Sequence, residues 1–352
     1  MLFNARWRKS PLAFREDSRG LSRCGLSAAI AHAKCGITLV MKRSVTIDGS
    51  RFGNLMESVD VAIQVYGKPH HTAVTLLSLL RHSGEHIAKI WFIEERKQPF
   101  GAEFTVIRNY LGDRVRYYRP PIWLGSAQLP WRGLHCFRPL RWSLRYQYAW
   151  EKSRQRYLYI THNDVLYTGN ILAPMLDRLQ GHLAAGPVGQ CWNCSASAAG
   201  ICSPSSFMSY RPTYSEWLRL SSQYPGARAD RYPQVVDPDQ PWPLPECRVN
   251  EWTLLVDLLK ARAATMPLGD AVPIGASFGM DTGTQWFHDV MNAGHHIAHV
   301  DTFAYARHAW ASSTGGGFPA LSDRKEYDRG EALAFEHLRT YYPDFFRLVQ
   351  KQ

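Results

Sequence analysis

The sequence predicts an α/β fold: a single domain, from about residue 58 onward, with a mixed, mainly parallel central sheet flanked by helices. Two patterns carry this prediction. Compact apolar strands alternate with segments of helical periodicity, and several strands end directly in polar or acidic residues. The 352-residue chain is 45% apolar and 20% charged, so it can bury a large core and lacks the composition of a disordered protein.

The first part of this domain shows the alternation most clearly. A β-branched run is stopped by Gly67-Lys68-Pro69, and a segment with leucines at helical spacing follows it. The next strand is apolar until it ends in two glutamates. This order predicts parallel βαβ units with right-handed crossovers. The expected strands are 59–66, 86–95 and 114–118, and the expected helices are 70–81 and 104–111.

The second part continues the pattern less regularly. A helix is expected to begin at Pro139, because proline suits the first helical position. An apolar strand then leads directly into His162-Asn163-Asp164. Leucine spacing after residue 249 predicts another helix, and Gly294 closes a later one. The expected helices are 139–153, 169–179, 249–262, 284–293 and 329–340, and the expected strands are 157–161, 182–187 and 296–300.

Composition divides the chain into segments. Residues 1–57 are basic and are expected to be a disordered tail, or an extension upstream of a later start at Met41. Residues 58–312 form the predicted domain, in which 190–247 is a loop-rich, cysteine-containing insertion around one helix at 214–222. Residues 313–352 read as a Gly-rich linker and a helix. No transmembrane segment is expected, because the longest weakly apolar run is interrupted by His32 and Lys34.

The formal net charge of +11 indicates an anionic partner, since a basic surface attracts phosphates and acidic glycans. The charge is mainly arginine scattered among aromatic residues, and no long Lys/Arg run is present. A dedicated nucleic-acid binder is therefore not expected. We expect a cytoplasmic protein whose surface can contact the inner face of the membrane.

The order of these parts resembles a known family. A strand, a helix and a strand ending in acids come first, followed by an Arg-bearing helix and an apolar strand that ends in a short acidic motif. A helix closed by Ala-Gly and a His after the next strand complete the series. This resembles the GT-A-fold glycosyltransferases, most of all their large inverting family, over residues 58–310. The resemblance implies a Rossmann-related domain that moves a sugar from a nucleoside diphosphate sugar to a hydroxyl of a glycan or glycolipid.

The resemblance implies a site for the nucleotide base at the ends of the first two strands. Tyr66 and Gly67 would lie against the base. Glu94 or Glu95 would stand where the family usually has an Asp that accepts a hydrogen bond from the base. The alternative is that these glutamates only solvate a strand end. Ligands of open α/β sheets bind beyond the carboxyl ends of the strands, which favours the functional interpretation.

Four further residues are candidates for contact with the nucleotide sugar. Arg141 and Arg145 could reach the diphosphate, because guanidinium groups match phosphate oxygens. The alternative is a solvated basic helix face. His162 and Asn163 immediately precede the acidic end of the short motif, so they too would lie near the donor.

A divalent metal is the cofactor that the resemblance implies. The family has an Asp-x-Asp motif whose last acid binds Mg²⁺ or Mn²⁺, and Asp164 holds that position. His162 replaces the first acid, which indicates a reduced dependence on metal. His308 would complete the site, although His296 and His299 compete for that role. The alternative for Asp164 is a strand-ending acid that caps a turn.

An inverting transferase needs one general base, and two acids are candidates. The resemblance places the base at the start of the helix closed by Ala-Gly, where Asp281 lies, although Met280 replaces the glutamate that usually accompanies it. Glu251 is the rival. Either acid could instead serve only its own helix start.

The cysteines give a separate signal. Cys191 and Cys194 are two residues apart, Cys202 follows, and Cys247 comes later, at the two ends of the loop-rich insertion. Four thiolates suit tetrahedral Zn²⁺, so a structural zinc that staples the insertion is one interpretation. The alternative is that these are small, unlinked core residues.

Two other functions fit parts of the sequence. The missing acids at His162 and Met280 are consistent with a degenerate, zinc-stapled module that binds acidic glycan or nucleic acid. A nucleotidyltransferase would need a Gly-rich phosphate loop after the first strand, and Gly67-Lys68-Pro69 is too short for one. The glycosyltransferase interpretation accounts for more of the pattern.

Overall fold

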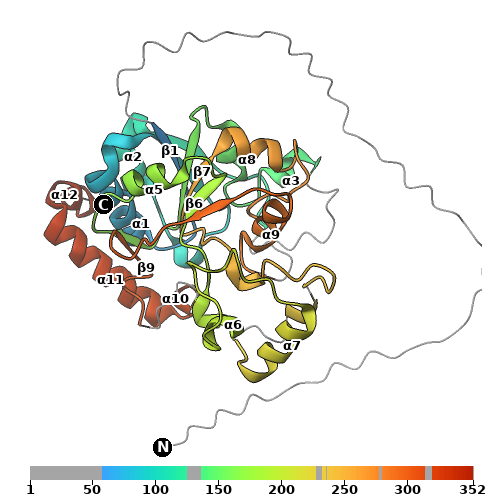
Figure 1. The fold of residues 1–352 in the computed structure, drawn as a ribbon. Helices are drawn as coiled ribbons and strands as arrows, with labels where there is room; N and C mark the ends of the chain where they lie inside the picture. The colour runs from blue at the N-terminus through green and yellow to red at the C-terminus, as the bar shows by residue number, and fades with distance from the viewer. Residues whose placement is uncertain are drawn as a thin grey trace, which may run out of the picture. The chain divides into compact units, whose positions relative to one another are not determined.

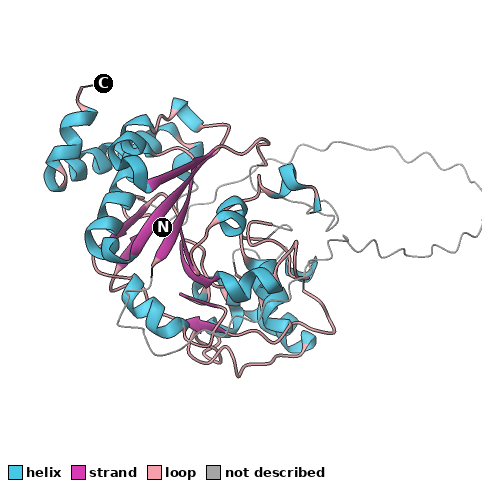
Figure 2. Ribbon diagram, turned by 90° about the horizontal axis from the view of Figure 1, so that it is seen from above, coloured by secondary structure: helices cyan, strands magenta, loops and turns pink. Residues whose placement is uncertain are grey.

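The computed structural model describes residues 58–124, 136–226, 232–234, 236–276, 280–313 and 319–351. Their core is a seven-stranded sheet with helices on both of its sides (Figure 2). The predicted α/β fold with a mixed, mainly parallel sheet is therefore confirmed. The basic extension predicted for residues 1–57 and the Gly-rich linker after Gly315 lie outside the described residues.

The first three strands are parallel and form one side of the sheet. They are β1 (Val59–Val65), β2 (Ile87–Glu94) and β3 (Val115–Tyr118), joined by α1 (Pro69–Ser83) and α2 (Thr105–Leu111). Every residue of β1 is buried, because this strand pairs with a neighbour on each side and is covered on both faces. These five elements match the predicted ones.

The rest of the sheet contains one reversed strand. Strand β4 (Tyr157–Thr161) is parallel to β1, whereas β7 (Thr253–Asp257) runs antiparallel between β4 and β6 (Ala184–Gly186). Strand β8 (Ile297–His299) then pairs parallel with β6. The strand order is β3-β2-β1-β4-β7-β6-β8. Because β7 is reversed, residues that precede it lie at the same sheet edge as residues that follow β1 and β4.

The helix predicted for residues 249–262 was wrong. Residues Thr253–Asp257 form β7, and α8 occupies only Leu258–Ala264. All five residues of β7 are buried between two neighbouring strands, and a continuous apolar run fits a buried strand as well as a helix. Asp257 ends the strand and caps α8 by accepting a hydrogen bond from the Leu259 backbone N–H. The preceding Glu251 therefore lies in a turn.

The single helix predicted for residues 139–153 was also wrong. It is divided into α3 (Arg138–Arg141) and α4 (Gln147–Lys152). Between them Tyr146 has a φ of 64°, and its backbone N–H donates to Oε1 of Gln64 at 3.1 Å. This long-range hydrogen bond favours a break that local helix propensity does not reveal. Arg141 and Arg145 consequently do not share one helix face.

A second, two-stranded sheet brings distant residues together. Strand β5 (Val165–Tyr167) pairs antiparallel with β9 (Ala306–His308), and Val165 lies opposite His308. The Ala309 backbone N–H also donates to the Asp164 carbonyl oxygen at 3.0 Å. These contacts fix the end of β9 beside the residues that follow β4.

The remaining helices follow the predictions closely. Helix α5 (Leu172–Leu179) begins later than residue 169, and α9 (Thr284–Asn292) precedes Gly294 as expected. The insertion at 190–247 consists mainly of loops in its described part, with α6 (Ser195–Ala198) and α7 (Tyr214–Gln223). The last described residues form α10 (Pro319–Ser322), α11 (Arg324–Tyr341) and α12 (Pro343–Val349).

The C-terminal helices belong to the same core as the sheet. Helix α11 lies along α1 (Figure 1), and its residues Ala334 and Leu338 are buried in one hydrophobic cluster with β1. Glu331 of α11 accepts hydrogen bonds from the backbone N–H groups of His70 and His71, at 2.8 and 3.2 Å. A carboxylate from a neighbouring helix therefore caps the N-terminus of α1, where a negative charge is favourable.

Glu331→Gln should destabilise the protein in a pH-dependent way. Burial alone would raise the pKa of Glu331, but hydrogen bonds from His70 and His71 outweigh it and lower the pKa to about 2. A carboxylate with a depressed folded pKa contributes stability above its unfolded pKa, and this is lost as the pH falls through the folded pKa. We expect a loss of roughly 1–3 kcal/mol at pH 7, shrinking between about pH 4.5 and pH 2.

Urea denaturation at pH 7, 4 and 3 measures this difference. Glu336→Gln is a matched control, because Glu336 lies on the same helix with an exposed side chain. A cost for Glu331→Gln that stays constant over the whole pH range would contradict the assignment.

Candidate functional site

The candidate site lies at the carboxyl-terminal edge of the parallel strands. The loops after β1 and β4 meet there, and β9 ends beside them. Because Thr161 of β4 pairs with Thr253 of the reversed β7, the turn that holds Glu251 and Trp252 reaches the same edge. Open α/β sheets bind ligands at this edge, so the polar residues gathered here are the ones to examine.

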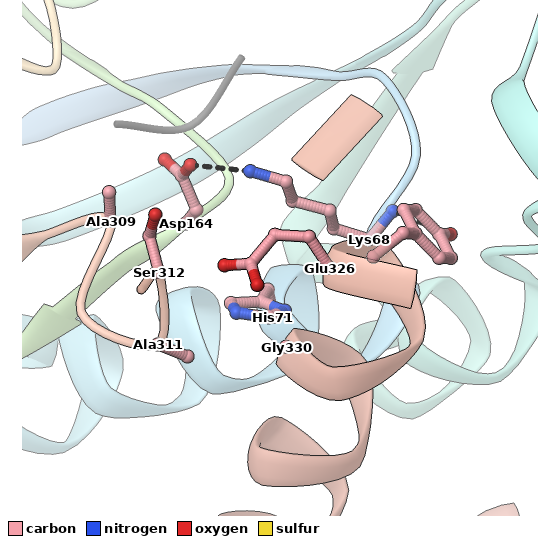
Figure 3. Close-up of a pocket in the computed structure, with 9 residues that line it drawn as sticks. Lys68, His71, Asp164, Ala309, Ala311, Ser312, Glu326 and Gly330 are labelled. Carbon is pink, nitrogen blue, oxygen red and sulfur yellow. Dashed lines mark hydrogen bonds and ion pairs between the residues drawn. The ribbon is translucent and has the colours of Figure 1, made fainter. Parts of the chain in front are cut away.

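Asp164 is the buried charge at the centre of the site. Its Oδ2 accepts a hydrogen bond from Nζ of Lys68 at 2.8 Å (Figure 3), and its Oδ1 lies 3.4 Å from Nε2 of His308. Oδ1 has no hydrogen-bond partner among the described residues. Burial would raise the pKa of Asp164, but Lys68, His308 and His162 hold it well below its usual range. The side chain is therefore a carboxylate.

Three side chains form a potential metal site. His162, Asp164 and His308 each offer a ligand atom, and these atoms lie within 4.8 Å of one another. Nδ1 of His162 is 3.2 Å from Nε2 of His308, and the ring of Trp252 stacks on His308 with centroids 5.3 Å apart. The residues fit a divalent cation, because Asp164 Oδ1 is buried without a hydrogen bond between two imidazoles. Two nitrogens and one carboxylate suit Mn²⁺, Zn²⁺ or Fe²⁺ better than Mg²⁺, which prefers oxygen ligands.

Lys68 was missed by the sequence analysis. It has a φ of 60°, a left-handed conformation that is costly for a residue with a side chain. The hydroxyl of Tyr327 accepts its backbone N–H at 3.0 Å, and its carbonyl accepts hydrogen bonds from the backbone N–H and hydroxyl of Thr72. These contacts point its side chain at Asp164. A lysine in the loop directly after a buried strand was the available signal. The sequence analysis considered this loop as a contact of the base and as a phosphate loop, but not its lysine as a partner of Asp164.

A chain of ion pairs extends the site away from Asp164. Nε2 of His162 lies 3.3 Å from Oε1 of Glu251, and the other oxygen of Glu251 pairs with the Arg248 guanidinium. Arg248 also contacts Oδ2 of Asp281 at 3.2 Å, and Nε2 of Gln190 donates to the same oxygen at 3.0 Å. Arg248 is buried and links the two acids that the sequence offered as rival bases. The sequence analysis missed Arg248 and Gln190, because neither lies in a recognisable motif.

The two acids differ in exposure and in surroundings. Glu251 is buried; burial would raise its pKa, but Arg248 and His162 shift the pKa far below its ordinary value. The side chain of Asp281 is 31% exposed, so an incoming hydroxyl can reach it. The N-cap residue of α9 is Gly283, two residues after Asp281, and the Thr284 backbone N–H donates to the Asp281 carbonyl at 3.2 Å.

The adjacent glutamates at the end of β2 have different partners. Oε1 of buried Glu95 accepts a hydrogen bond from Gln64, whereas its Oε2 has no hydrogen-bond partner among the described residues. Burial raises the pKa of Glu95, an effect that Gln64 and Arg145 partly offset. Glu94 instead lies 3.8 Å from Arg108. Each glutamate has an arginine nearby and one buried oxygen without a hydrogen-bond partner among the described residues, but only Glu95 is buried as a whole residue.

The loops after β1 and β4 are tied together beside Glu95. The backbone N–H of Gly67, next to Tyr66, donates to Oε1 of Gln98 at 2.7 Å. Nδ2 of Asn163 donates to the Gly67 carbonyl at 2.8 Å and to the Thr72 hydroxyl at 3.1 Å. Asn163 thus holds the two loops in position.

The two candidate arginines have different surroundings. Arg141 is buried and pairs with Glu151 through two hydrogen bonds of 2.6 and 3.1 Å, which accounts for its position without a ligand. Nη1 of Arg145 lies 3.5 Å from the Thr282 hydroxyl and acts electrostatically on Glu95. Of the two arginines, only Arg145 therefore lies near both Glu95 and Thr282.

The four cysteines of the insertion are free thiols. Cys194, Cys202 and Cys247 are buried close enough to raise one another's pKa, and burial raises that of Cys194 to about 12. Within the described residues, the cysteines do not form a set of three ligand atoms within the distance found for His162 and its partners. The structure thus shows them as buried thiols, and the zinc assignment, which includes Cys191, stays a prediction.

Comparisons with known proteins do not assign a family. None of the protein-family models matches the sequence, and no curated protein matches it. A solved structure of GalNAc-T7 with UDP, GalNAc and Mn²⁺ is similar over 38% of this chain and 23% of that chain, with 12% identity and a TM-score of 0.29. The aligned part thus spans about a quarter of that protein. Among the described helices, none is long and apolar enough to cross a membrane.

Arg248→Met should destabilise the protein strongly. It would leave Glu251 buried without its main cationic partner and would release Asp281, and breaking a buried ion pair from one side costs about 3–5 kcal/mol. Arg324→Met is the control, since Arg324 and Asp328 form an exposed pair that contributes little to stability. Denaturant midpoints measure both effects, and equal costs for the two variants would contradict the role given to Arg248.

Proposed function

We propose that this protein is a glycosyltransferase of the GT-A kind. It transfers a sugar from a nucleoside diphosphate sugar to a hydroxyl of a glycan or glycolipid, with inversion at the anomeric carbon. One observation carries the proposal: the acid that follows β4 lies in a single cluster with His162 and His308, at the carboxyl edge of the sheet. A basic chain suits an anionic donor.

His162, Asp164 and His308 would hold a divalent metal such as Mn²⁺, Zn²⁺ or Fe²⁺, which suit two imidazoles and a carboxylate. Such an ion neutralises the negative charge that develops on the departing nucleoside diphosphate. Trp252 orients the His308 ring by stacking on it, and Glu251 orients His162 from the other side. Buried Glu251 therefore serves as a positioning residue in this proposal.

Glu95 would recognise the base, with Tyr66 and Gly67 beside it. Gln64 occupies one oxygen of Glu95, so one buried carboxylate oxygen remains to accept an N–H. Uracil and thymine offer a single ring N–H on that edge, whereas guanine offers two adjacent N–H donors. The donor is therefore proposed to carry a uridine or thymidine nucleotide. Arg145 lies near enough to Glu95 to contact the diphosphate.

Asp281 would act as the general base. Arg248 and Gln190 hold its Oδ2 in place, and its partial exposure gives the acceptor access. The acceptor hydroxyl transfers its proton to Asp281 while its oxygen bonds to the anomeric carbon from the face opposite the leaving group. The bond from that carbon to the phosphate oxygen breaks, and the electron pair leaves with the nucleoside diphosphate.

Donor binding should depend on Asp164. We expect UDP- or dTDP-sugars to raise the melting temperature in the presence of Mn²⁺, GDP-sugars to have a smaller effect, and Asp164→Asn to abolish the metal-dependent part. Asp113→Asn is the control, because Asp113 is exposed and outside the site. Thermal shift and calorimetry measure the binding. The absence of binding by any donor to folded protein would exclude the transferase and favour a module that binds acidic glycans.

Asp281→Asn should slow the chemical step without preventing donor binding. Loss of a general base lowers kcat by about 10²–10⁴-fold, whereas donor affinity should stay within a few-fold of the wild type. Glu251→Gln should instead weaken metal binding, because it disturbs His162. Steady-state kinetics with the identified donor separate the two. The general base would be Glu251 and not Asp281 if Asp281→Asn left kcat unchanged and Glu251→Gln lowered kcat strongly at saturating metal.

A further inference from the structure

Lys68 and Asp164 form a buried ion pair inside the proposed metal site. Their side chains are only 7% and 6% exposed, are in direct contact, and line a small pocket together with residues of α11 (Figure 3). The pocket is also lined by His71, Glu326 and Tyr327. The ammonium group thus lies next to the carboxylate that a divalent cation would use.

The backbone holds Lys68 in this position. Its left-handed φ is maintained by Tyr327 on one side and by Thr72 on the other, and Pro69 begins α1 directly after it. A strained residue persists only where its surroundings over-determine it. The side chain therefore cannot be regarded as a surface lysine that meets Asp164 by chance.

The contact with Lys68 limits the negative charge that Asp164 can offer to a metal. Asp164 has two oxygens; Lys68 occupies Oδ2, and only Oδ1 faces the two imidazoles. A metal bound there would have a single carboxylate oxygen as its anionic ligand. It would also lie close to a positive charge that low local dielectric screens poorly. Both effects weaken binding of a cation.

We propose that Lys68 is a resident cation that competes with the divalent metal for Asp164 and sets the metal affinity of the site. This inference rests on the metal site of the proposed function. Without metal, Lys68 keeps Asp164 neutralised and the cluster intact. It also keeps one positive charge beside the diphosphate position, so donor binding depends only in part on metal.

Calorimetric titration of the full chain with Mn²⁺ alone tests the proposal. Lys68→Met and Lys68→Gln remove the charge, and Gln retains a hydrogen-bond donor for Oδ2. Both should bind Mn²⁺ about tenfold more tightly than the wild type, whereas Lys68→Arg should stay within about threefold. Lys89→Met is the control, because Lys89 makes an exposed contact with the Asp113 carbonyl. Asp164→Asn should abolish binding in every background.

Each result separates this inference from the proposed function. Unchanged or weaker Mn²⁺ binding by both neutral variants, with wild-type binding still abolished by Asp164→Asn, overturns the role of Lys68 and leaves the metal site standing. If neither the wild type nor any variant binds Mn²⁺, both the role of Lys68 and the metal site are overturned. Titration with UDP-sugar in the absence of metal then tests whether the protein is a metal-independent transferase. Should the neutral variants unfold without metal, recovery of the fold by Mn²⁺ supports the competition, and failure to recover contradicts it.

Discussion

The buried negative charge of Asp164 is the constraint on which the site depends. A carboxylate removed from water is costly unless it is paired, and here its partners come from two separate segments. Lys68 follows β1, His308 ends β9, and the β5–β9 ladder fixes His308 opposite the residue after Asp164. The sheet topology therefore brings a carboxylate, an ammonium group and an imidazole from distant parts of the chain to one edge.

His162 joins this cluster to a second one. One ring nitrogen lies beside His308, and the other faces Glu251, whose partner Arg248 also holds Asp281. Buried ion pairs of this kind contribute little net stability, because desolvation offsets attraction, but they fix geometry. The proposed metal ligands and the proposed general base, Asp281, are thereby connected through His162, Glu251 and Arg248. A displacement at either end would be transmitted through His162.

The sequence predicted elements formed by local patterns and missed those decided by distant contacts. Strands β1, β2 and β4 follow from apolar runs that end in polar residues. The reversed strand β7 was predicted to be a helix, because its leucines fit both a helix and a buried strand. Only its pairing with β4 and β6 shows that it is a strand. Asp164 and His308 were identified through the family resemblance, and the structure brings them together. Lys68 and Arg248 could not be identified from the sequence. Their roles depend on acidic partners that only the fold brings next to them.

Helix α11 bears on how the proposed function would bind the phosphates of a donor. A helix N-terminus at the edge of an α/β sheet is an anion site when its N–H groups are open. Here Glu331 accepts hydrogen bonds from the first turn of α1, so that end is already neutralised by a carboxylate. A diphosphate would meet repulsion there. In the proposed function, Lys68, Arg145 and a divalent ion at Asp164 would balance that charge instead.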